Sequence, residues 1–171
     1  MRKILLLCFV VCAMFSANAQ FYVGGTVGFW SQEIDKIETT TFTFLPEGGY
    51  AFNDKWAVGT TLGYIYSETD DFETKIFKFA PYARFSFFQK DMVRLFVDGG
   101  FDFNSVKPDK GDRISTFSTG LKPGIALDLS KNISLLAKFG FLGYEEYDDD
   151  SDGFGFNLNG NSLTFGLYYS F

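Results

Sequence analysis

The stretch Leu163-Thr164-Phe165-Gly166-Leu167-Tyr168-Tyr169-Ser170-Phe171 ends the chain with a strict alternation of residue types. Its odd-numbered positions are apolar, and its even-numbered positions are mostly small or polar. Side chains of an extended strand point to alternate faces, so one face of this stretch is apolar and the other is not. The pattern predicts a β-strand with an apolar environment on one side.

Four residues of this strand form a more specific pattern. Thr164, Gly166, Tyr169 and Phe171 follow the order polar, glycine, aromatic, terminal phenylalanine. This order resembles the C-terminal signal by which outer-membrane proteins of Gram-negative bacteria are recognised for assembly. The resemblance implies that the barrel assembly machinery is a partner. The alternative is the last strand of a soluble β-sandwich, so the interpretation depends on the rest of the chain.

The N-terminus predicts export. Arg2 and Lys3 precede an apolar run of 12 residues, Ile4 to Phe15, which is followed by Ser16-Ala17-Asn18-Ala19. A basic start, a short apolar run and small residues at the end are typical of a cleaved signal peptide. The run is shorter than the roughly 20 residues of a transmembrane helix. We predict a signal peptide at 1–19 and a mature domain at 20–171.

The composition excludes several classes of protein. The chain has 15 basic and 21 acidic residues, and removal of Arg2 and Lys3 leaves 13 against 21, a net charge of −8. An acidic chain of this kind is not expected to bind nucleic acid. Both cysteines, Cys8 and Cys12, lie in the predicted signal peptide, so we expect no disulfide in the mature protein. The 23 phenylalanines exceed what the core of so short a soluble domain holds, which favours an apolar exterior.

The mature sequence contains eight alternating segments, which predict eight β-strands. They lie at 21–31, 40–52, 56–67, 75–88, 93–104, 115–129, 133–144 and 163–171. The connections alternate between short turns, at 53–55, 89–91 and 130–132, and longer ones, at 32–39, 68–74, 105–114 and 145–161. Short periplasmic turns and long external loops are typical of transmembrane barrels. The segments are also longer than ordinary globular strands.

Three prolines count against regular central strands, because proline cannot donate a hydrogen bond to its neighbour. Pro46, Pro81 and Pro123 each precede a short turn by a similar distance. We interpret all three as β-bulges. The competing fold is a secreted β-sandwich, which would bury its phenylalanine face and would not alternate long and short connections.

The whole mature chain resembles the family of small outer-membrane β-barrels that includes the OmpA transmembrane domain and OmpX-like proteins. The resemblance implies an all-β fold, an eight-stranded antiparallel up-and-down transmembrane barrel, in the outer membrane of a Gram-negative bacterium. It also implies outer-membrane lipid and lipopolysaccharide as partners. The function expected is a structural or surface-interaction role, with an unidentified extracellular ligand if there is one. The alternative is a small porin-like channel for ions or small solutes.

We expect no enzymatic activity and no cofactor. Eight-stranded barrels that modify lipid A rely on a histidine, because a base that titrates near neutral pH activates the attacking hydroxyl. This chain contains no histidine. A pair of carboxylates could perform glycosidic chemistry, but no pair stands apart from the other acids.

An acidic run near the C-terminus suggests a weak calcium site. Asp148, Asp150 and Asp152, followed by Gly153, match the opening of a calcium-binding loop. The twelfth position of that loop is Asn159 instead of the usual glutamate, and no helical pattern flanks it. The alternative, a solvated acidic loop, is the more common use of such a run.

The inward faces of the predicted strands carry charged residues of both signs. They are Glu47, Lys78, Arg84, Arg94, Asp98, Asp102, Lys122, Asp128 and Lys138. Isolated charges in so narrow a space would be costly, so they should pair. Counting outward from the turn at 89–91 places Lys78 opposite Asp102, and Arg84 opposite Phe96 with Asp98 on the diagonal. We therefore predict a network of interior charges that plugs the barrel.

Overall fold

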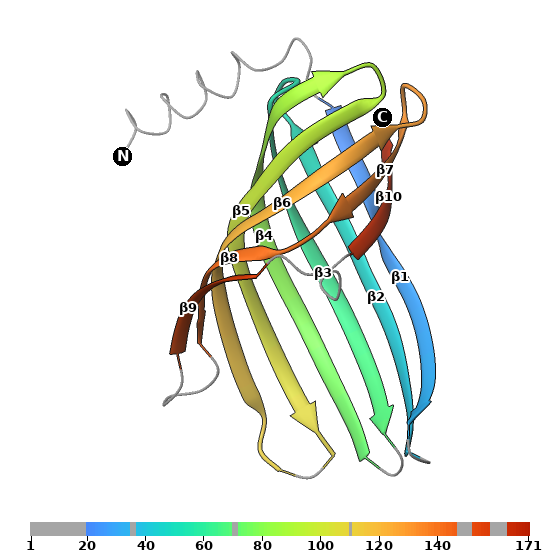
Figure 1. The fold of residues 1–171 in the computed structure, drawn as a ribbon, viewed down its shortest axis with the longest axis vertical. Coiled ribbons are helices and arrows are strands. Elements are labelled where there is room, and N and C mark those ends of the chain that lie inside the picture. Colours follow the sequence, from blue (N-terminus) through green and yellow to red (C-terminus); the bar gives the residue numbers. More distant parts are fainter. Residues whose placement is uncertain (1–19, 35–36, 70–71, 110, 147–151, 158–163) are drawn as a thin grey trace, which may run out of the picture.

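The structure is a computed structural model that describes residues 20–34, 37–69, 72–109, 111–146, 152–157 and 164–171. These residues form ten β-strands (Figure 1). The strands are β1 (Gln20–Ile34), β2 (Ile37–Ala51), β3 (Trp56–Thr69), β4 (Phe72–Lys90), β5 (Val93–Pro108), β6 (Ile114–Asp128), β7 (Ile133–Lys138), β8 (Phe141–Glu146), β9 (Asp152–Asn157) and β10 (Thr164–Ser170). Within the described ranges, no helix is long and apolar enough to cross a membrane.

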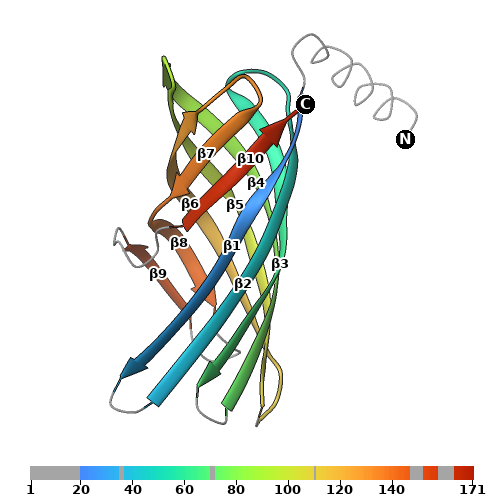
Figure 2. The same ribbon diagram turned by 90° about the vertical axis from the view of Figure 1, so that its right-hand side faces the viewer.

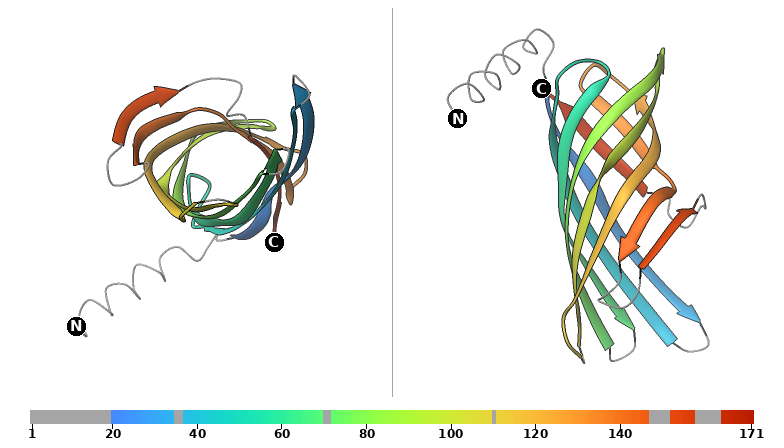
Figure 3. Two further views of the ribbon diagram at one scale, coloured as in Figure 1. Left: turned by 90° about the horizontal axis from the view of Figure 1, so that it is seen from below. Right: turned by 90° about the vertical axis from the view of Figure 1, so that its left-hand side faces the viewer.

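Eight of these strands close into a ring. Each strand from β1 to β5 pairs antiparallel with the next, β6 pairs with β7, β7 with β10, and β10 with β1. Seen along its length, the sheet surrounds a central space (Figure 3). The predicted eight-stranded antiparallel barrel is confirmed.

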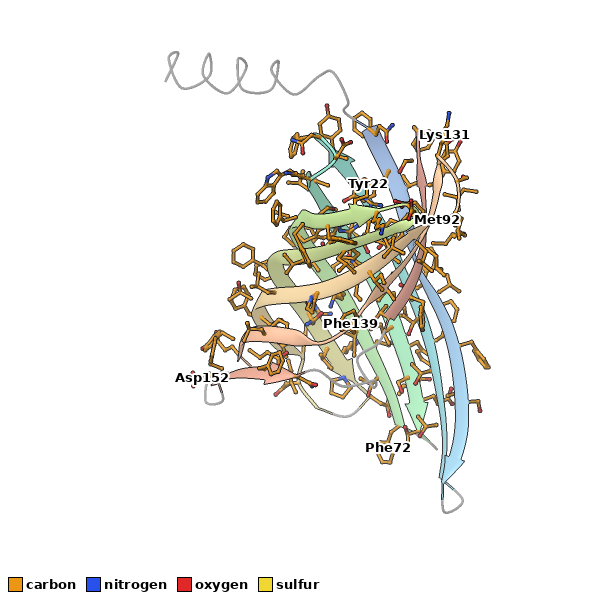
Figure 4. All side chains as sticks on the ribbon, turned by 45° about the horizontal axis from the view of Figure 1, so that its top comes forward. Tyr22, Phe72, Met92, Lys131, Phe139 and Asp152 are labelled. Carbon is orange, nitrogen blue, oxygen red and sulfur yellow. The ribbon has the colours of Figure 1, made fainter. Side chains whose placement is uncertain are left out.

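The two ends of the barrel differ in their connections. One end, here called the turn end, carries the short connections that include Met92 and Lys131, and the C-terminus lies beside them (Figures 1 and 4). Phe72 at the start of β4 and Asp152 at the start of β9 lie towards the opposite end, here called the loop end (Figures 2 and 4). The connections therefore alternate between opposite ends, as predicted. The predicted alternation of length is wrong, because β1 and β2, and also β3 and β4, are separated by only two residues at the loop end.

The strands are longer at the loop end than the sequence predicted. The connections expected at 32–39, 68–74 and 105–114 are wrong as given, because strands occupy most of the first two ranges and half of the third. Polar side chains in these ranges pair across strands instead of ending them, as the hydroxyls of Thr39 and Thr69 do at 3.1 Å. Cross-strand pairs of hydroxyl residues stabilise a sheet as apolar pairs do, so polarity alone did not mark the strand ends.

The seventh predicted segment, 133–144, is wrong as a single strand. It divides at Phe139 and Gly140 into β7 and β8, and Gly140 has a φ of 73°, a region that favours glycine. The break shifts the alternation by one residue, so Phe141, predicted to face outward, lines the interior. The centroid of its ring lies 5.7 Å from Lys122 Nζ. β8 pairs with the loop-end half of β6, and β9 pairs with β8 in a range predicted to be a connection.

The interpretation of the prolines as bulges is wrong for Pro46 and Pro81, which keep the regular register of their ladders. Pro123 keeps its register with β5, while on its other side the ladder of β6 with β7 and β8 shifts by one residue. Gly25, the register partner of Pro46, lacks the Cβ that would meet the backbone of β2, so the two strands can approach closely. The shift in the β4–β5 ladder lies instead between Ser86 and Phe88, next to the turn end.

The distribution of residues is the reverse of that in a soluble domain. On β4, the outward-facing Phe77 and Phe87 are 52% and 57% exposed. The inward-facing Arg84 is 5% exposed, and Phe96 beside it on β5 is 1% exposed. Charged and aromatic side chains therefore fill the barrel, while phenylalanines cover its outer wall. This is the pattern expected for strands that face lipid.

Candidate functional site

Four charged side chains meet at the centre of the barrel, from four different strands. Arg84 on β4 donates two hydrogen bonds to Asp98 on β5, from Nε to Oδ1 at 2.7 Å and from Nη2 to Oδ2 at 2.8 Å. Lys138 on β7 donates to both carboxylate oxygens of Glu47 on β2, at 2.9 and 3.0 Å. Two weaker contacts join the pairs, Arg84 Nη2 to Glu47 Oε1 at 3.6 Å and Lys138 Nζ to Asp98 Oδ2 at 3.3 Å. We call Glu47, Arg84, Asp98 and Lys138 the central quartet.

The central quartet is neutral and shielded from water. Glu47, Arg84 and Asp98 are 8%, 5% and 3% exposed. Transferring such charges from water costs several kcal/mol per ion, and only close partners with good geometry offset this cost. The forked arginine–carboxylate contact is the strongest geometry available for a pair of this kind. The residues hold one another in place, because loss of any one leaves a buried charge without its partner.

Three tyrosines and a phenylalanine enclose the quartet. Tyr168 on β10 donates to Glu47 Oε2 at 2.6 Å, and the hydroxyls of Tyr22 and Tyr82 lie 2.8 Å apart. The Arg84 guanidinium carbon lies 4.2 Å from the ring centroid of Phe96. Aromatic faces attract cations, and tyrosine hydroxyls satisfy the remaining carboxylate lone pairs. These aromatic side chains therefore pack around the buried charges.

A second group of charges lies nearer the loop end. Lys78 donates to Asp102 Oδ2 at 2.9 Å, and Lys122 donates to the same oxygen. Two ammonium groups therefore share one carboxylate. All three side chains are partly exposed, so water solvates this group more than it does the central quartet.

A third group lies towards the turn end. Arg94 Nη2 donates to Asp128 Oδ1 at 3.0 Å, and Ser134 Oγ donates to the same oxygen at 2.7 Å. The Nε atom of Arg94 is buried without a hydrogen-bond partner among the described residues. The ion pair is half-buried and connects β5 to β6.

The residues predicted to form an interior network thus lie in three groups, and the side chains within each group contact one another. The two pairs derived from the turn at 89–91 are both present as contacts, Lys78 with Asp102 and Arg84 with Asp98. Their predicted register is wrong by two residues, since Arg84 lies directly opposite Asp98 and Lys78 has Asp102 on the diagonal. The turn between β4 and β5 is centred later in the chain than expected, which changes the register of the two strands. The one-residue register shift between Ser86 and Phe88 reverses part of this change. A register error of two residues leaves every side chain on the same face of the sheet. The two predicted pairs are therefore still in contact.

Sequence reasoning missed the tyrosines around the central quartet. Tyr22, Tyr82 and Tyr168 occupy inward-facing positions of β1, β4 and β10. Their alternation with outward apolar residues could have identified them, because a buried tyrosine normally needs a partner for its hydroxyl.

A cavity of about 390 Å³ lies on the loop-end side of the quartet. Its wall includes charged groups, such as Lys78, Asp102 and Glu145, and apolar ones, such as Leu45 and Phe141. Glu47, Asp98 and Lys138 also line it, so the cavity extends from the quartet towards the loop end.

The predicted calcium ligands do not form a described site. Asp148 and Asp150 lie outside the described residues. Asp152 begins β9, where its register partner is Glu146. In the part of the chain that the structure describes, no group of three acidic, histidine or cysteine side chains could hold a metal ion.

The predicted assembly residues form the final strand. Thr164 and Gly166 face inward on β10, while Tyr169 and Phe171 face outward and are exposed. The backbone N–H of Phe171 donates to the carbonyl of Phe21 at 3.0 Å, which joins the two ends of the domain. The predicted signal peptide, 1–19, lies outside the described residues.

Comparison with known proteins identifies the family. A family model described as outer membrane protein beta-barrel domain matches residues 4–171. No curated protein matches the chain significantly. The fold is similar to the crystal structure of Neisserial surface protein A, with a TM-score of 0.57 and 13% identity over 90% of this chain and 96% of that one. It is also similar to the N-terminal β-barrel domain of Pseudomonas aeruginosa OprF, with a TM-score of 0.53 and 13% identity over 90% of this chain and 98% of that one. The chain therefore belongs to the outer membrane protein beta-barrel domain family and is a protein of the Gram-negative outer membrane.

Proposed function

We propose that this protein is a structural barrel with a closed interior, which presents its loop end for contacts outside the cell. The observation that carries the proposal is the central quartet, whose four charges come from β2, β4, β5 and β7 and are held by short contacts. Side chains that bridge the lumen in this way stiffen the ring and occupy the path that a solute would take.

The dimensions of the barrel support a closed interior. An eight-stranded barrel is just wide enough for its own side chains to fill. Phe96, Leu136 and Tyr168 are almost completely buried beside the quartet. To open a water path, paired charges and packed aromatic rings would have to separate together, which makes opening costly.

The proposed role is not enzymatic. The chain lacks histidine, the side chain best suited to act as a base near neutral pH. The interior carboxylates Glu47, Asp98, Asp102 and Asp128 each contact a lysine or an arginine. These contacts occupy the carboxylate oxygens that a general acid or base would need free for its substrate.

Contacts outside the cell would use the loop end. Phe154 and Phe156 on β9 are 80% and 65% exposed, beside Tyr144 and Leu142 on β8. Exposed aromatic residues of this kind are enriched where proteins meet partners or membrane interfaces. At the turn end, the exposed Tyr169 and Phe171 are the proposed contacts for the barrel assembly machinery.

Conductance of the refolded protein in planar bilayers tests the closed interior. We expect negligible conductance from the wild type. The double variant Arg84→Ser with Asp98→Ser removes the forked pair without leaving an unpaired charge and should admit water and ions. Lys90→Ser with Asp91→Ser, a matched neutral change in an exposed turn, should remain closed. Steady openings of the wild type would contradict the proposal.

The cavity favours a second candidate function, a narrow channel. About 390 Å³ of space already lies on the loop-end side of the quartet, so a channel would need only the quartet layer to rearrange. The same recording separates the two functions, since a channel conducts in its wild-type form.

A further inference from the structure

The cavity on the loop-end side of the central quartet arises from the strand register. Gly100 on β5 and Gly120 on β6 are register partners, and both line the cavity. They lie in the row between Asp98, in the quartet, and Asp102, in the second group of charges. Adjacent residues without side chains leave space at this level of the barrel. The cavity of about 390 Å³ can hold a small ligand, because ligand pockets typically measure about 300–1,000 Å³.

The second group of charges contains one more cation than anion. Lys78 donates to Asp102 Oδ2 at 2.9 Å, and Lys122 donates to the same oxygen. An ammonium group has three donors, so each lysine keeps donors beyond its contact with Asp102. All three side chains are partly exposed and line the cavity. A ligand that brings an anionic acceptor would therefore balance the second positive charge.

An acidic side chain lies farther along the same wall. Asp102 pairs with Ser118, and Ser118 pairs with Glu145, in one row across β5, β6 and β8. Neighbouring strands lie about 4.8 Å apart, so the backbones of Asp102 and Glu145 are separated by about 10 Å. Glu145 and Ser118 also line the cavity. The wall therefore presents a cationic region beside Asp102 and an acidic one at Glu145, with a hydroxyl between them.

The described charges around the cavity balance one another. The central quartet is neutral, and the second group together with Glu145 is neutral as well. A ligand with a net charge would disturb this balance in a space partly shielded from water, which is costly. A ligand with one charge of each sign would keep it. The wall also includes Leu45 and Phe141, so such a ligand can carry an apolar group.

We propose that the cavity binds a small zwitterion of the amino-acid type with an apolar side chain. Its carboxylate accepts hydrogen bonds from Lys78 and Lys122, and its ammonium group donates to Glu145. Charge-assisted hydrogen bonds of this kind are about twice as strong as neutral ones. The apolar side chain lies against Phe141. This site goes beyond the proposed structural role, because binding on the loop-end side leaves the buried quartet in place.

Calorimetric titration of the refolded protein in a non-ionic detergent tests this assignment. The probes are phenylalanine, N-acetylphenylalanine, which lacks the ammonium group, and phenethylamine, which lacks the carboxylate. All three share one benzyl group. We expect phenylalanine to bind about tenfold more tightly than either analogue, as the loss of a charge-assisted contact implies. Equal binding of the three probes, or no binding of phenylalanine, overturns the proposal.

Two variants remove one end of the site at a time. Lys122→Gln keeps the pair of Lys78 with Asp102 and removes the additional cation. Phenylalanine should then lose its preference over phenethylamine. Glu145→Gln removes the carboxylate that accepts from the ammonium group, so phenylalanine should lose its preference over N-acetylphenylalanine.

Lys107→Gln and Glu146→Gln are the matched controls, because both residues are exposed and neither lines the cavity. Each should keep the wild-type preferences. The proposal is overturned if a control loses a preference to the same extent as the variant it matches. Heat-modified migration in gels confirms that each variant is folded. The comparison of the three probes on the wild type needs no variant, so it decides the proposal even if one variant fails to fold.

Discussion

The turn-end half and the loop-end half of this barrel are built in different ways. In the turn-end half, β10 pairs with β1 at Tyr22–Gly25 and with β7, so the ring is complete. In the loop-end half, β8 and β9 continue the sheet from β6, and among the described residues no strand pairs with β1 beyond Gly25 on the side of β10. Figure 2 shows β10 ending beside the upper part of β1.

The interiors of the turn-end half and the loop-end half also differ. The central quartet and Phe96 are buried at the turn-end side of the cavity, which extends from them towards the loop end. The residues of β9 are exposed on both faces. We infer that closure and stability reside mainly in the turn-end half, which leaves the loop-end half free to vary its contacts.

Removal of Asp98 should have the largest effect on stability. Asp98→Ala deletes the forked acceptor of Arg84 and leaves Arg84 and Lys138 with Glu47 alone. Breaking a buried pair typically costs about 3–5 kcal/mol. Urea unfolding of the refolded protein measures this loss. Asp54→Ala, which removes the same charge from an exposed turn, should leave the midpoint unchanged; equal stability of both variants would show that the quartet does not hold the barrel.

Substitution of a glycine beneath the tyrosines should have an intermediate effect. A Cβ at Gly59 would lie 2.6 Å from the hydroxyl oxygens of both Tyr22 and Tyr82, so Gly59→Ala should separate their hydrogen bond. Overpacking of this kind costs about 1–3 kcal/mol. Gly155→Ala on β9 is the matched change in the loop-end half, where a Cβ would meet nothing within 4 Å. Similar unfolding curves for the two variants would contradict the contrast between the halves.

Removal of Asp102 should lower the free energy of unfolding less than Asp98→Ala or Gly59→Ala does. Asp102→Ala leaves Lys78 and Lys122 without their shared acceptor, but both ammonium groups are partly exposed and water can solvate them. The loss should be about 1 kcal/mol, near the upper range for exposed pairs. Urea unfolding beside Asp98→Ala provides the comparison. A loss as large as that of Asp98→Ala would mean that the loop-end half contributes equally to stability.

Strand number and side-chain faces could be predicted from the sequence, because alternation is a local property of the chain. Arg84, Asp98 and Lys138 were assigned to the interior by parity alone. The partner of Lys138 could not be predicted, because Glu47 lies on β2 and their contact depends on how the ring closes. The same limit applies to Tyr168, which reaches Glu47 across the seam between β10 and the start of the domain.

Local errors arose where the backbone departs from a regular strand. The break at Phe139–Gly140 turns Phe141 inward, and no change in residue type marks it apart from one glycine. The register between β4 and β5 depends on the exact centre of the turn that joins them and on the one-residue shift between Ser86 and Phe88. The alternation of apolar and polar residues predicts neither of these features.

The period of two and the composition were enough to predict an eight-stranded barrel with an apolar wall and a charged interior, because both are local properties of the chain. The three-dimensional arrangement was needed to show which charges meet, where the cavity lies, and that β9 pairs with β8 and, within the described residues, not with β1. These features depend on contacts between residues that lie far apart in the chain, such as Glu47 and Lys138. Such contacts are selected by ring closure and packing rather than by any local pattern.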